Sequence, residues 1–214
     1  MPKSRSLDMD ATSIQHLCRN DSRLARVIEM IGPIDYSIHD EEPYAFLIHE
    51  IIEQMLSVKA GAKIYGRLID ACKGNVCPEV ISALSDEELK AIGTSKNKVS
   101  YIRYLTEKIL RNELDLDSLK ELSDADVMKS LTSIKGIGNW TAKMYLIFVL
   151  DRQDILPIED VAFLQSYKWL YQTNDTSPES VKSRCLLWKP YSSVAARYLY
   201  RALDSGLVKT EFPS

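Results

Sequence analysis

The segment "LTSIKGIGNWTAKMYLIFVL", residues 131–150, decides the fold because a very short turn joins its two apolar, helix-like parts. It holds two of the 8 glycines in the 214-residue chain, Gly136 and Gly138, with one residue between them. A helix that ends near Ser133 and another that begins near Asn139 predict a tight hairpin. Glycine allows a positive φ and a close approach of the backbone to its neighbours. We expect both glycines to serve this purpose.

Such a hairpin presents backbone N–H groups at the positive end of the following helix, an arrangement that binds anions such as a DNA phosphate. Lys135 and Lys143 add positive charge nearby. Contacts of this kind hold the DNA backbone without reading its sequence. The alternative is an ordinary turn between two helices, in which the glycines merely save space. The hairpin alone does not decide between the two.

Most of the chain has helical spacing of its apolar residues, as in the segment 43–72. Ser85 and Glu88 predict a capping box, Ser123 predicts an N-cap, and Ser177 followed by Pro178 predicts another helix start. We find no convincing strand pair. The sequence therefore predicts an all-α protein of about ten short helices.

The composition, with 45% hydrophobic and 27% charged residues, is that of a globular protein. No apolar run reaches the roughly 18 residues that span a membrane, and the N-terminus lacks the apolar core of a signal peptide. We therefore expect no membrane partner and a location in the cytoplasm, in the bacterial nucleoid, or in the nucleus if the protein is eukaryotic. The four cysteines are scattered, which predicts free thiols and no iron–sulfur cluster.

The net charge of −3 argues mildly against nucleic-acid binding, although binding depends on local patches. Basic residues gather in two stretches, 90–111 and 182–201. Charge runs of this kind are usually solvated faces. The charge pattern by itself therefore assigns no partner.

Four motifs in order resemble those of the helix-hairpin-helix DNA glycosylase superfamily. They are "IIEQMLSVKAGAKI" at 51–64, "GIGNWTA" at 136–142, "LPIED" at 156–160 and "WKPYSSVAARYLY" at 188–200. The last is similar to an element of the 3-methyladenine DNA glycosylase II branch. The length leaves no room for the N-terminal β-lobe of some relatives, which implies the compact form.

The resemblance implies an all-α helix-hairpin-helix glycosylase fold with two lobes and the active site in the cleft between them. We expect residues 1–214 to form one such module. The first lobe would comprise approximately residues 1–50 and 155–214. The second would comprise approximately 51–154 and contain the hairpin at 134–138.

The resemblance assigns the catalytic carboxylate to Asp160, which follows Pro157 and lies beyond the hairpin. One carboxylate can stabilise an oxocarbenium-like sugar and activate water. Asp160 is also a favoured N-cap for the helix that begins in "PIEDVAFLQSY", and Glu159 is its rival for the catalytic role. Trp140 stands where strand-cleaving relatives carry a Schiff-base lysine. The chain would therefore be a monofunctional enzyme that leaves an abasic site.

The resemblance also suggests residues for the base pocket and for DNA. Trp140, Met144 and Tyr200 match pocket positions, where aromatic faces hold a flipped cationic base. Met55 matches the wedge that fills the gap left by this base, although a Met buried on a helix face is the alternative. Ser57 is either a helix cap or a phosphate contact. The full set expected to bind DNA is Met55, Ser57, Lys135, Gly136, Ile137, Gly138 and Thr141.

In this family, hairpin carbonyls hold a monovalent cation, K⁺ or Na⁺, and the matching residues are Thr132, Ile134 and Ile137. Lys135 replaces the Pro of many relatives, so the hairpin would be less rigid. We expect no required cofactor, a monomer, and double-stranded DNA with alkylated bases such as 3-methyladenine as the partner. The alternatives are a non-catalytic helix-hairpin-helix DNA-binding protein and a bifunctional oxidised-base glycosylase/lyase.

Overall fold

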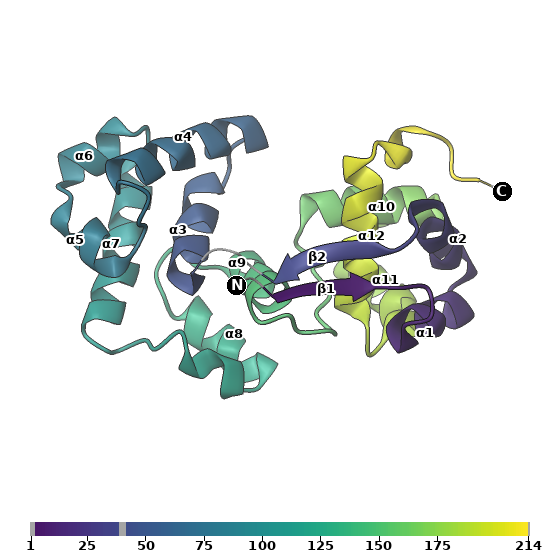
Figure 1. Ribbon diagram of the computed structural model, residues 1–214. Helices are drawn as coiled ribbons and strands as arrows, with labels where there is room; N and C mark the ends of the chain where they lie inside the picture. The colour runs from purple at the N-terminus through teal and green to yellow at the C-terminus, as the bar shows by residue number, and fades with distance from the viewer. Residues whose placement is uncertain (1–2, 39–41, 214) are drawn as a thin grey trace. The chain divides into compact units, whose positions relative to one another are not determined.

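A computed structural model describes residues 3–38 and 42–213. Over these ranges it contains twelve α-helices, short 3-10 and π-helical segments and two β-strands, so the predicted all-α class is confirmed (Figure 1). The chain divides into two compact units, which we call unit 1 (Met1–Ile38 with Leu146–Ser214) and unit 2 (His39–Tyr145).

The helix α3, Pro43–Glu53, belongs to unit 2 because it packs on α4 and α7. The division of the chain therefore lies at residues 38 and 145. Both points precede the positions, near 50 and 154, that the sequence suggested.

Unit 1 contains two strands and five α-helices among the described residues. These are β1 (Lys3–Leu7), α1 (Thr12–Asn20), α2 (Ser22–Ile31), β2 (Ile34–Ile38), α10 (Val161–Tyr171), α11 (Pro178–Arg184) and α12 (Ser192–Asp204). The short 3-10 segments η3 (Cys185–Trp188) and η4 (Leu207–Lys209) flank α12. The helix α12 packs on both α2 and α10 and is thus central to the unit.

The antiparallel pair of β1 and β2 corrects the expectation that the chain has no strand pair. The two strands run side by side in Figure 1, with a register from Lys3 opposite Ile38 to Leu7 opposite Ile34. Each strand has only five residues, β1 is mostly polar, and two helices separate the partners in the sequence. Leu7 and Ile34 are both buried, which fixes this end of the pair.

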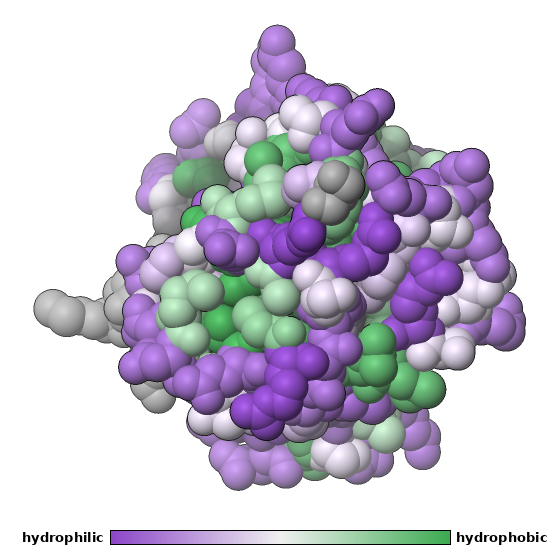
Figure 2. Space-filling view, turned by 90° about the vertical axis from the view of Figure 1, so that its right-hand side faces the viewer, coloured by the Kyte–Doolittle hydropathy of each residue, from purple (hydrophilic) through white to green (hydrophobic). Residues whose placement is uncertain are grey.

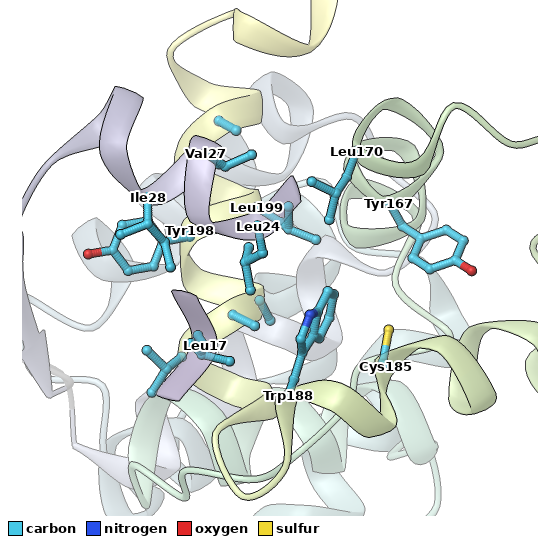
Figure 3. Close-up of a cluster of buried hydrophobic side chains, with 14 of the residues drawn as sticks. Leu17, Leu24, Val27, Ile28, Tyr167, Leu170, Cys185, Trp188, Tyr198 and Leu199 are labelled. Carbon is cyan, nitrogen blue, oxygen red and sulfur yellow. The ribbon is translucent and has the colours of Figure 1, made fainter. Parts of the chain in front are cut away.

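The core of unit 1 brings apolar side chains of α1, α2, α10 and α12 around Trp188 (Figure 3). A buried carboxylate, Asp21, lies at its edge and caps α2 by accepting from the backbone N–H groups of Arg23 and Leu24. The other carboxylate oxygen accepts from the Trp188 indole N–H at 2.8 Å and from the Tyr171 hydroxyl. Burial and this hydrogen bond raise the pKa of Tyr171.

All regular elements among the described residues of unit 2 are helices. Its elements are α3, α4 (Val58–Ala71), α5 (Pro78–Ala83), α6 (Asp86–Ala91), α7 (Lys96–Leu110), η1 (Ser118–Glu121), α8 (Asp124–Thr132) and α9 (Asn139–Met144). A π-helical segment, η2 (Tyr145–Val149), follows α9 directly in the chain, and its residues from Leu146 on belong to unit 1. The predicted capping box of Ser85 and Glu88 and the predicted caps at Ser123 and Ser177 are all confirmed.

The predicted hairpin lies between α8 and α9 and is built on a type II turn. The Ile137 N–H donates to the Ile134 carbonyl at 3.0 Å, and Gly136 has φ +94° at the third position of the turn. A type II turn requires a positive φ there. An ideal Cβ on Gly136 would lie 2.3 Å from Cγ of Tyr101 in α7. The hairpin thus needs glycine at 136 for both conformation and space.

Gly138 does not need glycine's freedom, which corrects the expectation for the second position. Its φ of −97° and ψ of −178° are extended, and a Cβ would meet no atom within 4 Å. It is the N-cap residue of α9, where glycine is well tolerated. The two glycines therefore have different functions.

The face shown in Figure 2 is mainly hydrophilic, with smaller hydrophobic areas between the hydrophilic residues. Scattered exposed apolar residues are normal on the surfaces of globular proteins. No helix within the described ranges has both the length and the apolar character needed to cross a membrane.

The hairpin geometry predicts opposite outcomes for the two glycines. Gly136→Ala should lower the free energy of unfolding by at least about 2 kcal/mol, because alanine disfavours the left-handed region and its Cβ overlaps Tyr101. Gly138→Ala is the matched control and should cost less than about 1 kcal/mol. Urea denaturation followed by circular dichroism measures both, and equal losses would contradict the assigned turn.

Asp21 should contribute more to the free energy of unfolding than an ordinary helix cap. Asp21→Ala should lower the free energy of unfolding by about 3 kcal/mol, because it removes the cap and leaves the buried Trp188 and Tyr171 donors without their acceptor. Ser177→Ala, which removes the cap of α11, should cost only about 1 kcal/mol. A loss for Asp21→Ala no larger than this control, in the same urea titration, would refute the buried network.

Candidate active-site carboxylate and nucleic-acid interface

Asp160 lies at the start of α10 in unit 1 and is held on both sides. Its backbone N–H donates to the Pro157 carbonyl at 3.0 Å, and its Oδ1 accepts from the Phe163 N–H at 2.7 Å. The predicted N-cap role is therefore confirmed. The side chain is largely buried, with Asp160 only 8% exposed, whereas Glu159 is exposed. Of the two neighbouring carboxylates, Asp160 thus has the fixed orientation that a catalytic group needs.

The "WKPYSS" motif ties the loop before Asp160 to the start of α12. Asp154 accepts from the Ser192 hydroxyl at 2.5 Å and from Lys189 Nζ at 3.0 Å. The Ser193 hydroxyl accepts from the Ile155 N–H at 2.8 Å, and the Ser193 N–H donates to the Gln153 carbonyl. These bonds show that the motif at 188–200 holds the loop that leads to Asp160.

Tyr200 is half-buried on α12 and lies within an aromatic group of unit 1. Its ring centroid is 6.1 Å from that of Phe148. The Arg197 guanidinium lies 5.1 Å from the Phe148 ring and 4.0 Å from the Tyr36 ring. The Arg197 cation and the Tyr200 ring therefore both lie near the ring of Phe148. No sequence pattern marked Arg197 for this place.

Arg197 also shows that the second basic stretch is not simply a solvated face. It is buried, donates to the Ile147 carbonyl at 2.7 Å and pairs with Asp151 at 3.4 Å. Burial lowers the pKa of its guanidinium. Asp151 has a positive φ of 52° and also pairs with Arg5, so this network fixes the turn after η2.

The first basic stretch is mostly engaged within unit 2. Four of its basic residues form ion pairs with acidic residues: Lys90 with Glu87, Arg103 with Asp86, Lys108 with Glu113, and Arg111 with Glu107. Lys98 donates hydrogen bonds to two backbone carbonyls. The position of these charges in the sequence therefore does not by itself indicate a DNA-binding face.

The residues of the hairpin and of α9 differ in how far they are exposed. Thr141 is buried, and its hydroxyl accepts from Gln54 Nε2 at 3.4 Å. Ile137 and Met144 are also buried, whereas Trp140 is half-buried. Any contact of Ile137 with DNA would therefore come from its backbone. Thr141 uses its hydroxyl inside unit 2.

Met55 lies in the loop between α3 and α4, and its exposed fraction of 102% rules out the alternative of a buried core methionine. Ser57 caps α4 by accepting from the Ala60 N–H, so its cap role is confirmed while phosphate contact stays a prediction. Gln54 lies in the motif at 51–64, and its side chain donates to the Gly136 carbonyl at 2.8 Å. This bond joins the Met55 loop to the hairpin.

The hairpin can supply at least one carbonyl ligand to the expected monovalent cation. The Ile134 carbonyl accepts one hydrogen bond, from the Ile137 N–H, and a carbonyl oxygen has two acceptor sites. The other two expected ligands are the carbonyls of Thr132 and Ile137. The cation itself stays a prediction of the resemblance.

The residues expected from the sequence thus fall into two groups. Unit 1 carries Asp160 and Tyr200, and unit 2 carries the hairpin, Met55 and the half-buried Trp140. Sequence reasoning missed Gln54, Lys98 and Arg197. Gln54 and Arg197 stand in the motifs at 51–64 and 188–200, whereas Lys98 stands in neither.

The chain is similar in sequence to one family of DNA repair proteins. The family model described as HhH-GPD superfamily base excision DNA repair protein matches residues 48–190. The alkylbase DNA glycosidase-like protein mag2 of Schizosaccharomyces pombe is 31% identical over 193 residues, covering 87% of this chain and 91% of that protein.

Two solved structures are similar in fold. A DNA-3-methyladenine glycosidase from Bacillus halodurans has a TM-score of 0.82 and 35% identity, covering 95% of this chain and 94% of the other. The S. pombe 3-methyladenine DNA glycosylase Mag1 in complex with abasic DNA has a TM-score of 0.83 and 28% identity, covering 91% of this chain and 97% of the other. The glycine hairpin, the buried Asp160 and these matches together establish that the chain belongs to the HhH-GPD superfamily of base excision DNA repair proteins.

Proposed function

We propose that this protein is a monofunctional DNA glycosylase for alkylated bases of the 3-methyladenine and 7-methylguanine type. It extrudes the damaged base from double-stranded DNA and hydrolyses the N-glycosidic bond, which leaves an abasic site. Family membership supports the reaction class, and relatives named for alkylbase or 3-methyladenine glycosylase activity support the substrate class. The observation that carries the proposal is the buried, oriented carboxylate of Asp160.

The chemistry of the substrate matches a site with a single carboxylate. A base alkylated at N3 or N7 carries positive charge, so its bond to the sugar is already weakened and it leaves with little acid assistance. The enzyme must then stabilise the oxocarbenium-like sugar and position a water molecule. Asp160 supplies the negative charge for the first task and a proton acceptor for the second.

The N-cap contact prepares Asp160 for this role. Because the Phe163 N–H fixes Oδ1, the carboxylate need not reorganise when charge develops on the sugar. The start of α10 also favours negative charge through the helix dipole. The same contact therefore serves both folding and catalysis.

Trp140 supports the monofunctional reaction. Glycosylases that cleave the strand use an amine nucleophile that forms a Schiff base with the sugar. An indole cannot form this bond, and the nearby Lys143 lies three residues further along α9. Water is then the nucleophile, and the phosphodiester backbone stays intact.

Base release from DNA treated with a methylating agent tests the proposal. Wild type should release 3-methyladenine or 7-methylguanine, detected by chromatography, and Asp160→Asn should be at least about 100-fold slower. Asparagine is as good an N-cap as aspartate, so the variant should keep its fold. Glu159→Gln is the matched control and should retain activity. Equal loss in both variants would contradict the role of Asp160, and DNA binding without any base release would favour the non-catalytic alternative.

The strand itself provides a second test. After base release, the DNA should remain intact on a denaturing gel until heat or alkali breaks it at the abasic site. Borohydride should trap no covalent protein–DNA adduct, because Trp140 offers no amine for a Schiff base. Spontaneous cleavage together with a borohydride-trapped adduct would show a bifunctional enzyme instead.

A further inference from the structure

Met55 adopts a backbone conformation that normally favours glycine. The Leu56 N–H donates to the Glu53 carbonyl at 3.0 Å, Gln54 has φ −47° and ψ 129°, and Met55 has φ 59°. These values describe a type II turn with Met55 at the position that requires a positive φ. A residue with a Cβ is strained in this conformation, so surrounding contacts must hold it.

Lys98, in the first turn of α7, supplies such contacts. Its ammonium donates to the Ile52 carbonyl and to the Gln54 carbonyl, each at 2.7 Å. Both carbonyls lie at the C-terminal end of α3, where helix carbonyls lack helical partners and a positive charge is favourable. Burial lowers the pKa of this ammonium. The cation is thus used to fix the backbone directly before Met55.

Gln54 connects the same turn to the hairpin. Its side-chain amide donates to the Gly136 carbonyl at 2.8 Å, and Gly136 is the positive-φ residue of the second type II turn. Tyr101, one helical turn after Lys98, packs directly against Gly136. One face of α7 therefore holds both turns, while the Met55 side chain between these contacts is fully exposed.

We propose that Lys98 and Gln54 are positioning residues for Met55, which hold its turn so that the side chain enters the duplex where the damaged base leaves. This inference rests on the proposed function. An apolar side chain in the gap compensates for the lost stacking of the extruded base, and its effect depends on being held in place before binding. Lys98 and Gln54 act through Met55 and do not touch the reacting atoms.

The test compares two duplexes that differ in how strongly the damaged base is held. One carries 7-methylguanine opposite cytosine, and the other carries it opposite a mismatched adenine, where extrusion costs less. Lys98→Met and Met55→Ala should each slow single-turnover base release about tenfold on the paired duplex and less than about threefold on the mismatched one. The double variant should be no slower than Met55→Ala alone, because Lys98 acts through Met55.

The matched control is Lys108→Met, the same substitution about 15 Å further along α7, where the lysine pairs with Glu113 at the surface. It should leave both rates unchanged. If Lys98→Met does not unfold cooperatively in urea, Gln54→Ala replaces it, with the same expected dependence on pairing. Equal slowing on both duplexes, or a double variant slowed by the product of the single effects, would overturn the inference.

A second measurement separates this inference from the proposed function. A 2-aminopurine beside a tetrahydrofuran abasic analogue should brighten when Met55 unstacks it, without any base release. Wild type and Lys108→Met should give this signal, whereas Met55→Ala and Lys98→Met should lose most of it. If wild type released no base yet gave this pattern, the proposed function would fail and the positioning role would stand. Unchanged fluorescence in Lys98→Met would refute the positioning role.

Discussion

The close contact between Gly136 and the Tyr101 ring is the constraint on which unit 2 depends. It leaves no room for a Cβ, and it presses the hairpin directly onto α7. Because Lys98 lies one turn earlier on the same helix, α7 also fixes the end of α3. The hairpin, the Met55 loop and the start of α9 thus share one reference element. A single helix below two turns is a suitable support for residues that must keep a fixed position.

In unit 1, buried polar groups hold the corresponding elements in place. Asp21 orients Trp188, which begins the "WKPYSS" motif, and the serines of this motif hold the loop that leads to Asp160. Both carboxylate oxygens of the buried Asp21 accept hydrogen bonds, as buried polar groups require. The loop before α10 is thus held at residues 153–155 by the motif, and Asp160 is held by its own bonds to Pro157 and Phe163. Asp21 is also linked to α10 itself, because the Tyr171 hydroxyl at the end of that helix donates to it.

Local signals in the sequence predicted the local features well. The helix class, the hairpin between residues 133 and 139, the serine caps and the cap role of Asp160 all depend on residues close together in the chain. The pair of β1 and β2 escaped prediction because its partners are far apart and one strand is polar. The partial burial of Lys98 and the burial of Arg197 escaped prediction for a related reason. A charged residue is normally exposed, and only contacts from distant elements show otherwise.

The discontinuity of unit 1 has a consequence for the order in which the protein is made. The segment with β1, α1, α2 and β2 leaves the ribosome first, but α10 and α12, which cover its apolar faces, follow only after the whole of unit 2. At ordinary rates of synthesis, about 5–20 residues per second, this segment waits several seconds for its partners. Unit 2 is continuous and can fold during that interval. The hairpin of unit 2 can therefore be folded before α10, which Asp160 caps, packs into unit 1.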